Sequence, residues 1–299
     1  MKRRRTSAMA LAVAALVTGT GATAPTPTPR PTPTATQMDG TLQILTYRGY
    51  AEYGGVSPKA NWVGSFEKET GCRLARLDAV DTPADLAARA TTGDYDVITA
   101  GPTLAADLIA RKQVQPIDPA KVGGYDDLSG RFRDMAKVSG KVYGVPYLWG
   151  YHEFVYDLGK VKGESLGQAF DSDRIALRDN PLTIADAALA DTTVKDPYEL
   201  SEEQFERAVT LLEQRKGRTY WKKPIELVKG FATGTLDYAE ATPYYRLLLQ
   251  KAGLPVKTVP TTARTGWLDS WMLGANLPDT TCAYRWLTWM TASGAQRDA

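Results

Sequence analysis

The chain has 299 residues, of which 43% are hydrophobic and 23% charged, as expected for one large or two ordinary soluble domains. The formal net charge is +2, but residues 1–39 hold five of the 36 basic and one of the 34 acidic residues, so residues 40–299 carry a net −2. A folded part with this charge argues against nucleic-acid binding. Two cysteines and one histidine, His152, exclude most zinc sites.

The N-terminus has the three-part pattern of a secretory signal. Residues 2–5 are basic, residues 8–17 form an apolar run too short to span a membrane, and small residues follow, so we expect a signal over 1–24. Residues 25–33 alternate Pro with Thr or Arg, so a semi-rigid linker is expected over 25–39. The protein is therefore expected outside the cytoplasm, in a periplasm, on a cell surface or secreted.

The two cysteines agree with export. Cys72 and Cys282 allow one intramolecular pairing, and oxidising compartments favour disulfides. In the chain-entropy model, closing a loop of this length stabilises by roughly 4–5 kcal/mol. Two buried free thiols are the alternative.

Strands and helices alternate in the first half of the folded part. Strands are expected at 42–47, 74–77 and 95–99, and helices at 61–70, from 82 and from 101. This alternation predicts a mostly parallel α/β sheet. Ligands of such sheets bind outside the carboxyl ends of the strands, which points to residues 47–50 and 101–103.

The second half repeats the alternation. Ser201 and Gln204 form a capping-box pattern for one of its helices. Strands are expected at 143–150, 174–177, 236–241 and 267–273, and helices at 179–190, 201–215, 225–233, 243–252 and 281–291. The sequence has no phosphate-binding loop of the Walker or G-x-G-x-x-G type.

Several stretches in this order resemble the extracytoplasmic solute-binding proteins of ABC importers, in the polyamine (spermidine/putrescine) class. They are FEKETGC at 66–72, GDYDV at 93–97, YGVPYLWG at 143–150, GWLDSW at 266–271 and CAYRWLTWM at 282–290. The resemblance covers about residues 40–295, and it rests on their order and spacing together.

The resemblance implies an α/β, two-lobe periplasmic-binding-protein fold (type II) with two interlobe crossovers and a central ligand cleft. Lobe 1 would comprise 40–145 and 266–299, and lobe 2 would comprise 146–265. A branch of the family carries cysteines in both contexts found here, which favours the Cys72–Cys282 disulfide within lobe 1. Family members usually continue past the last helix and return to the second lobe, so a tail is either absent or truncated at Ala299.

The implied ligand is putrescine, spermidine or a similar small organic cation. Such a ligand needs aromatic faces for its methylene stem and carboxylates for its ammonium groups. By resemblance, Tyr47 and Tyr50 are aromatic walls, Trp267 is the stacking tryptophan and Asp269 binds the ammonium group. Each also has a plain structural interpretation, as a core, surface or capping residue.

Other positions depart from the polyamine pattern. Asn180 and Thr183 stand where polyamine binders have two carboxylates, and Thr242 and Thr103 stand where aromatic residues are common. These four residues, with Gly101 and Trp149, complete the expected ligand-binding set.

Nearby charges give mixed indications. Glu153 and Glu240 could compensate for the missing carboxylates, or they are simply solvated. Arg48 near the cleft mouth would disfavour a cation and could bind a carboxylate.

Two other functions compete with this one. Tyr244 and Tyr245 fall where related ferric-ion-binding proteins place paired tyrosines, whose oxygens suit a hard trivalent cation, although packing at a helix start also explains them. His152 and Glu153 could be an acid–base pair of a secreted enzyme, but adjacent strand residues point to opposite faces. We expect no catalytic residue, no cofactor and no metal, a monomer, and a membrane ABC permease as partner.

Overall fold

The computed structural model describes residues 40–55, 60–215, 218–261, 263–277, 281–292 and 294–295, which belong to one compact unit, Met38–Ala299. The predicted signal and linker, residues 1–39, lie outside the described residues. Within the described ranges, no helix is long and apolar enough to cross a membrane.

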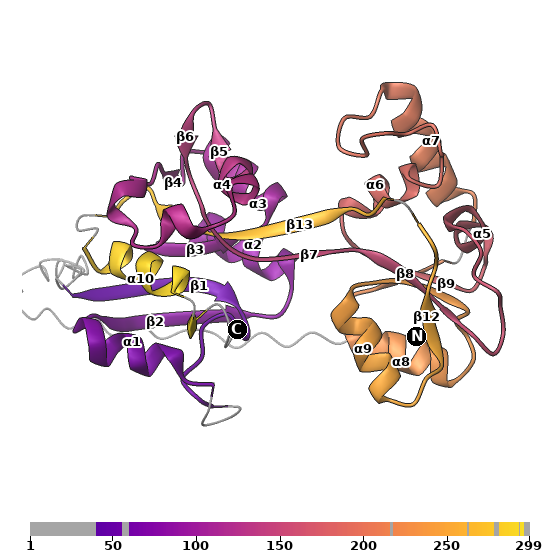
Figure 1. Ribbon diagram of the computed structural model, residues 1–299, viewed down its shortest axis with the longest axis horizontal. Helices are drawn as coiled ribbons and strands as arrows, with labels where there is room; N and C mark the ends of the chain where they lie inside the picture. The colour runs from indigo at the N-terminus through magenta and orange to yellow at the C-terminus, as the bar shows by residue number, and fades with distance from the viewer. Residues whose placement is uncertain are drawn as a thin grey trace, which may run out of the picture. The chain divides into compact units, whose positions relative to one another are not determined.

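The first lobe is built on a six-stranded sheet of order β2-β1-β3-β13-β4, with β7 paired to β13 (Figure 1). Parallel pairing joins β1 to β2 and β3, whereas β13 is antiparallel to β3, β4 and β7. The strands are β1 (Thr41–Tyr47), β2 (Arg73–Val80), β3 (Val97–Ala100), β4 (Val114–Gln115), β7 (Val145–Tyr151) and β13 (Gly266–Gly274).

Helices cover both faces of this sheet. Successive side chains of a strand point to opposite faces, so the apolar residues of these strands need a covering layer on each side. Ile44 of β1 packs in one core and Leu45 in the other, and Trp271 and Met272 of β13 divide in the same way. The first core contains α1 (Trp62–Thr70) and α10 (Thr281–Thr291), and the second contains α2 (Pro83–Thr92) and α3 (Pro102–Ala110). A shorter helix, α4 (Gly130–Met135), and a hairpin of β5 (Lys137–Val138) and β6 (Lys141–Val142) lie between β4 and β7 in sequence.

The second lobe has a five-stranded sheet of order β10-β9-β11-β8-β12. Phe154 of β8 packs with α5, α6 and α7, whereas the neighbouring Val155 packs with α8 and α9. The elements are β8 (Glu153–Asp157), β9 (Ile175–Arg178), β10 (Thr219–Trp221), β11 (Tyr238–Ala241), β12 (Val256–Thr258), α5 (Leu166–Asp171), α6 (Leu182–Ala188), α7 (Glu202–Glu213), α8 (Pro224–Ala232) and α9 (Pro243–Lys251).

Two crossover strands connect the sheets. β7 continues through His152 into β8, and β13 begins after Thr265, so the chain passes between the sheets at these two points. β7 and β13 run side by side in antiparallel pairing (Figure 1). Beyond that pairing, the backbone N–H of His152 donates to the carbonyl of Thr265 at 2.8 Å.

The expectation of a mostly parallel sheet is wrong. β9 is parallel to β10 and β11, but β8 is antiparallel to β11 and β12. The crossovers explain this, because β13 returns to the first lobe against the direction of β3, and β8 continues from β7 without an intervening helix. The sheets are therefore mixed.

The predicted disulfide is confirmed. Cys72 and Cys282 are bonded, with Cα atoms 5.8 Å apart and 210 residues between them in sequence. Both are buried, and the bond joins the start of β2 to α10. It therefore closes the first lobe on itself.

Candidate functional site

Residues from three strands of the first lobe meet around Asp269 of β13. Tyr47 is the last residue of β1, Tyr50 follows in the next turn, and Gly101 caps α3 directly after β3. The hydroxyl of Tyr50 donates to Oδ2 of Asp269 at 2.6 Å. A Cβ atom on Gly101 would lie 2.9 Å from Oδ1 of Asp269, so a larger residue would require the carboxylate to shift. The structure thus brings together four of the predicted site residues.

Asp269 is a buried carboxylate whose charge is costly. Only 7% of the residue is exposed, and burial raises the pKa of Asp269 to about 6, although the Tyr50 hydrogen bond and the charge of Arg178 oppose this. Burial, together with the charge of Asp269, also raises the pKa of both Tyr47 and Tyr50, so the two phenols stay neutral. At neutral pH the site therefore offers one anion lined by neutral aromatic groups.

Tyrosine rings cluster on the side of this carboxylate where Tyr50 lies. The ring of Tyr50 meets those of Tyr47 and Tyr147 edge-on, each with centroids 5.4 Å apart. Trp267 is half-buried and lies against Gly150 of the other crossover, where a Cβ atom would be 2.5 Å from its ring. Tyr147 was not predicted, although its place in β7 opposite β13 made it a candidate.

Two other predicted residues, one on the crossover strand β7 and one on α3, are exposed. Trp149 of β7 is 58% exposed and contacts the ring of Phe132, with centroids 5.4 Å apart. Thr103, in the first turn of α3, is also exposed. The structure does not join either side chain to Asp269 by a hydrogen bond or ring contact among the residues it describes.

The predicted residues of the second lobe have local partners. Asn180 accepts a hydrogen bond from the backbone of Leu182, at the start of α6, and Thr242 accepts one from the backbone of Tyr245, at the start of α9. Thr183 is buried and its hydroxyl lies 3.0 Å from Glu240. These contacts account for the residue types at all three positions.

Arg178, the last residue of β9, was not among the predicted site residues. Its guanidinium NH1 lies 2.7 Å from Nε2 of His152, and its Cζ lies 5.5 Å from the ring centroid of Trp221. Like Tyr47, Arg178 stands at the carboxyl end of a parallel strand, which is where ligands bind in α/β sheets. A basic residue one position after the predicted strand 174–177 was the available signal.

His152 is part of a buried network and not of an exposed acid–base pair. A guanidinium can only donate, so Nε2 of His152 accepts the hydrogen bond from Arg178. The ring proton is then on Nδ1, which donates a hydrogen bond to Oδ2 of Asp186 at 2.7 Å. The other oxygen of Asp186 accepts from the hydroxyl of Thr265 at 2.6 Å. Burial, and then the charge of Asp186, raise the pKa of Glu240 well above its usual value.

His152, Asp186 and Glu240 are also the one group of potential metal ligands in the described part of the chain, with ligand atoms within 4.8 Å of one another. Each of these side chains is already hydrogen-bonded to protein. Glu240 accepts from the backbone of Arg178 at 3.0 Å and from Thr183, and the ring nitrogens of His152 contact Asp186 and Arg178. The group therefore acts as a network that holds Arg178.

The remaining charged candidates lie in ion pairs. Glu153 is buried and accepts from Arg246 at 2.7 Å, which accounts for its charge within the second lobe. Arg48 is exposed and pairs with Asp81 at 2.7 Å. Glu153 therefore does not supply a second carboxylate for a dication.

Tyr244 and Tyr245 begin α9. Tyr244 is 63% exposed, whereas Tyr245 packs edge-on against Trp221 with ring centroids 5.1 Å apart. Burial raises the pKa of Tyr245, which works against a tyrosinate ligand.

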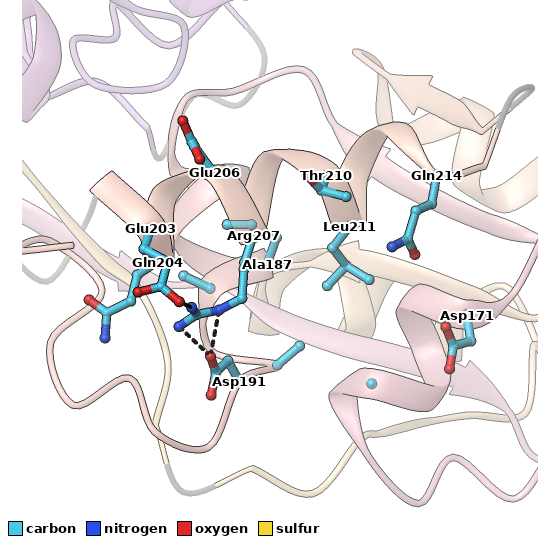
Figure 2. Close-up of a pocket in the computed structure, with 14 residues that line it drawn as sticks. Asp171, Ala187, Asp191, Glu203, Gln204, Glu206, Arg207, Thr210, Leu211 and Gln214 are labelled. Atoms are coloured by element: carbon cyan, nitrogen blue, oxygen red, sulfur yellow. Dashed lines mark hydrogen bonds and ion pairs between the residues drawn. The ribbon is translucent and has the colours of Figure 1, made fainter. Parts of the chain in front are cut away.

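A surface pocket lies elsewhere in the second lobe, among α5, α6 and α7, with a volume of about 510 Å³ (Figure 2). Arg207 crosses it and pairs with Asp191 at 3.0 Å and Glu203 at 2.6 Å. No predicted site residue lines it. Arg207, Asp191 and Glu203 thus neutralise one another, and the pocket is distinct from the site around Asp269.

The chain is similar to known bacterial binding proteins in both sequence and fold. The family model described as bacterial extracellular solute-binding protein matches residues 61–299. A putrescine/agmatine-binding protein of Pseudomonas aeruginosa is 30% identical over 120 residues, which is 39% of this chain and 31% of that protein. The chain thus aligns with less than a third of that relative's length.

Solved structures match over more of the chain. The spermidine/putrescine ABC transporter substrate-binding protein PotD of Streptococcus pneumoniae has a TM-score of 0.67 at 15% identity, covering 86% of this chain and 79% of its own. The binding protein AgtB of A. tumefaciens, solved with agropinic acid, has a TM-score of 0.62 at 18% identity, covering 87% and 80%. At these identities, the two likenesses establish the two-lobe fold alone.

Proposed function

Since the chain belongs to the family of bacterial extracellular solute-binding proteins, we propose that this substrate-binding component of an ABC transporter captures a small organic cation, with a polyamine as the first candidate. Loaded protein would then deliver the cation to a membrane permease. We expect neither an enzymatic activity nor a cofactor. We place the protein in a periplasm or on a cell surface, as its N-terminal signal pattern predicts.

The single observation that carries the proposal is the environment of Asp269. A carboxylate that is 7% exposed and has one side-chain donor among the described residues, the hydroxyl of Tyr50, is short of favourable partners for its charge. An ammonium group would supply both a positive charge and further donors. The rings of Tyr47 and Tyr50, and that of Trp267 two residues before Asp269 on β13, suit the methylene stem and the cation.

The comparisons support an amine as ligand, but they leave its class open. The names of the Pseudomonas aeruginosa and Streptococcus pneumoniae proteins specify polyamines and agmatine, whereas AgtB was solved with agropinic acid. Because the fold is compatible with different ligands, the choice of a cation rests on Asp269.

Capture would proceed by closure of the two lobes around the ligand. We assign residues 40–145 and 266–299 to one lobe and 146–265 to the other, with bending at the two crossovers. Hinge closure of this kind uses a few residues at the ends of elements, which here are the segments at His152 and Thr265.

Calorimetric titration of the full-length oxidised protein with putrescine, spermidine and n-butylamine tests the proposal. We expect saturable one-to-one binding by at least one amine, and a loss of at least about tenfold in affinity in Asp269→Asn, because charge-assisted hydrogen bonds contribute about 1.5–3 kcal/mol. The same substitution at Asp157, a buried aspartate paired with Lys160 in the second lobe, is the matched control and should change affinity less than about twofold. Absence of amine binding, or wild-type affinity in Asp269→Asn, would contradict the proposal.

A further inference from the structure

Arg178 is held in place by neighbours on two sides. NH1 of its guanidinium is 2.7 Å from Nε2 of His152, and the ring of Trp221 lies 5.5 Å from Cζ. His152 is fixed in turn by Asp186, and Trp221 is fixed by a hydrogen bond from its Nε1 to the backbone carbonyl of Glu240 at 2.9 Å. A side chain supported in this way is preorganised, so little of its freedom is lost when it binds a partner.

Within the described part of the chain, the guanidinium of Arg178 forms no ion pair with a carboxylate. Among the residues that the structure describes, no carboxylate oxygen lies within 4.0 Å of the guanidinium. The side chain makes a single hydrogen bond there, to His152, and none of its nitrogens is a buried atom without a partner. Since a guanidinium carries five N–H groups, the remaining ones are open to a ligand.

The two acidic groups of the buried network are committed to other donors. Asp186 accepts from His152 and from Thr265, at 2.7 and 2.6 Å. Glu240 accepts from the backbone N–H of Arg178 and from the hydroxyl of Thr183, both at 3.0 Å. Glu240 orients Arg178 through its backbone N–H, and Asp186 does so through His152. Neither carboxylate forms an ion pair with the guanidinium.

Arg178 and the groups around Asp269 lie at the carboxyl ends of parallel strands, where ligands bind in α/β sheets. Its charge lowers the pKa of Asp269 and that of Tyr47, against the larger effect of burial, so the guanidinium lies within electrostatic reach of both. Arg178 is at the carboxyl end of a strand in the second lobe, and Tyr47 is at the carboxyl end of a strand in the first. The site therefore combines one fixed anion with one fixed, unpaired cation.

We propose that the ligand is a zwitterion, an ω-amino acid or a compound of that form, whose ammonium group binds Asp269 and whose carboxylate binds Arg178. The proposal rests on the binding of an amine by Asp269 proposed above, and it replaces the polyamine as first candidate with an amine that also carries a carboxylate. A guanidinium can hold a carboxylate through two parallel hydrogen bonds, which an ammonium group cannot make. A diamine would instead bring its second positive charge toward Arg178 and be repelled.

The decisive experiment compares ligands that differ at one end only. Full-length oxidised protein is titrated with ω-amino acids of three to six carbons, with α,ω-diamines of the same lengths, and with n-butylamine. At the best chain length we expect the amino acid to bind at least about tenfold more tightly than the diamine and the monoamine, since it alone satisfies both fixed charges. This comparison needs no variant and so does not depend on how a variant folds.

Substitution of Arg178 then assigns the carboxylate end. Arg178→Gln should lower the affinity for the best amino acid by at least about tenfold, because the contact with its carboxylate is lost. The affinity for n-butylamine, which has no carboxylate, should stay within about threefold of the wild-type value. Arg178→Lys keeps the positive charge but loses the planar guanidinium, so its affinity for the amino acid should lie between those of the wild type and Arg178→Gln. Arg48→Gln, an exposed arginine paired with Asp81, is the matched control and should match the wild type.

The outcomes separate the two proposals. A diamine that binds as tightly as the best amino acid, or an amino acid whose affinity survives Arg178→Gln, overturns the zwitterion while leaving amine capture intact. Failure of every amine-bearing ligand, or indifference of n-butylamine to Asp269→Asn, removes the proposed function together with the zwitterion.

Discussion

Asp269 shows how one residue can make ligand capture depend on pH. Burial raises the pKa of its carboxyl to about 6 from an ordinary value of 3.8. Below about pH 6 the free protein holds this group protonated, so an ammonium ligand must displace a proton to bind. Amine affinity should therefore fall by up to about tenfold for each unit below pH 6 and stay level above about pH 7, as calorimetry between pH 5 and pH 8 would show.

The same shift has the opposite consequence for the unliganded fold. Because the folded protein binds the proton more tightly than the unfolded chain, Asp269 reduces the free energy of unfolding as the pH rises from about 4 to about 6.

Asp269→Asn should abolish the acid dependence of whatever weak amine binding remains. If wild-type affinity is constant from pH 5 to pH 8, the carboxylate of Asp269 is not the group that receives the amine.

At this scale the sequence predicted part of the site. Tyr50 and Asp269 are 219 residues apart, and only the family resemblance placed them together, because no local pattern reports a long-range contact. Arg178 was missed for the same reason: its open guanidinium becomes visible only when its neighbours and their partners are known. His152, taken as a catalytic alternative for being the single histidine, is a buried support for that arginine.

Single elements were predicted best where their ends are chemically marked. Asn61, Thr82 and Ser201 were expected to begin helices, and each accepts a hydrogen bond from a backbone N–H in the first turn. β10 and β12 were missed, because three-residue strands have no detectable period and depend on neighbours distant in sequence. Caps are encoded locally, whereas short strands are encoded by the sheet that they join.

The disulfide links two elements of the first lobe and leads to a prediction about stability. Replacement of both Cys72 and Cys282 by alanine should lower the free energy of unfolding in urea by roughly 2–5 kcal/mol, because the bond closes a loop of 210 residues and restricts the unfolded chain. Ligand affinity should change less than about twofold, since the bond joins β2 to α10 and neither partner contacts Asp269.

Reduction of the wild-type protein gives an independent comparison. A reducing agent should shift its urea midpoint in the same direction as the double substitution, and it should leave the doubly substituted protein unchanged. An equal midpoint for the oxidised protein and the variant would show that the bond does not contribute to stability, and a large loss of ligand affinity would show that it shapes the site.

The molecule as a whole depends on the two crossovers, and their organisation could not be read from hydrophobic patterns. The 267–273 segment was predicted as extended, but its pairing direction is set by the return of the chain from the second lobe, so the sheets are mixed. Asp186 of α6 accepts from His152 after β7 and from Thr265 before β13. One buried carboxylate of the second lobe thus anchors both crossovers.

This anchor predicts that a change at Thr265 affects stability and hinge motion together. Thr265→Val keeps the shape of the side chain but removes the donor to Asp186, and leaving a buried carboxylate oxygen short of a donor should cost about 1–3 kcal/mol. The backbone N–H of His152, which donates to the carbonyl of Thr265, should then exchange with solvent faster.

Thr261→Val, on the same segment, is the control. It removes a hydroxyl that donates to Ala263 within its own turn, and it should change the unfolding free energy by less than about 0.5 kcal/mol. Unchanged stability and unchanged exchange in Thr265→Val would mean that the backbone pairing of β7 with β13 joins the crossovers without help from Asp186. In that case bending on ligand binding would be shared along the paired strands and not concentrated at His152 and Thr265.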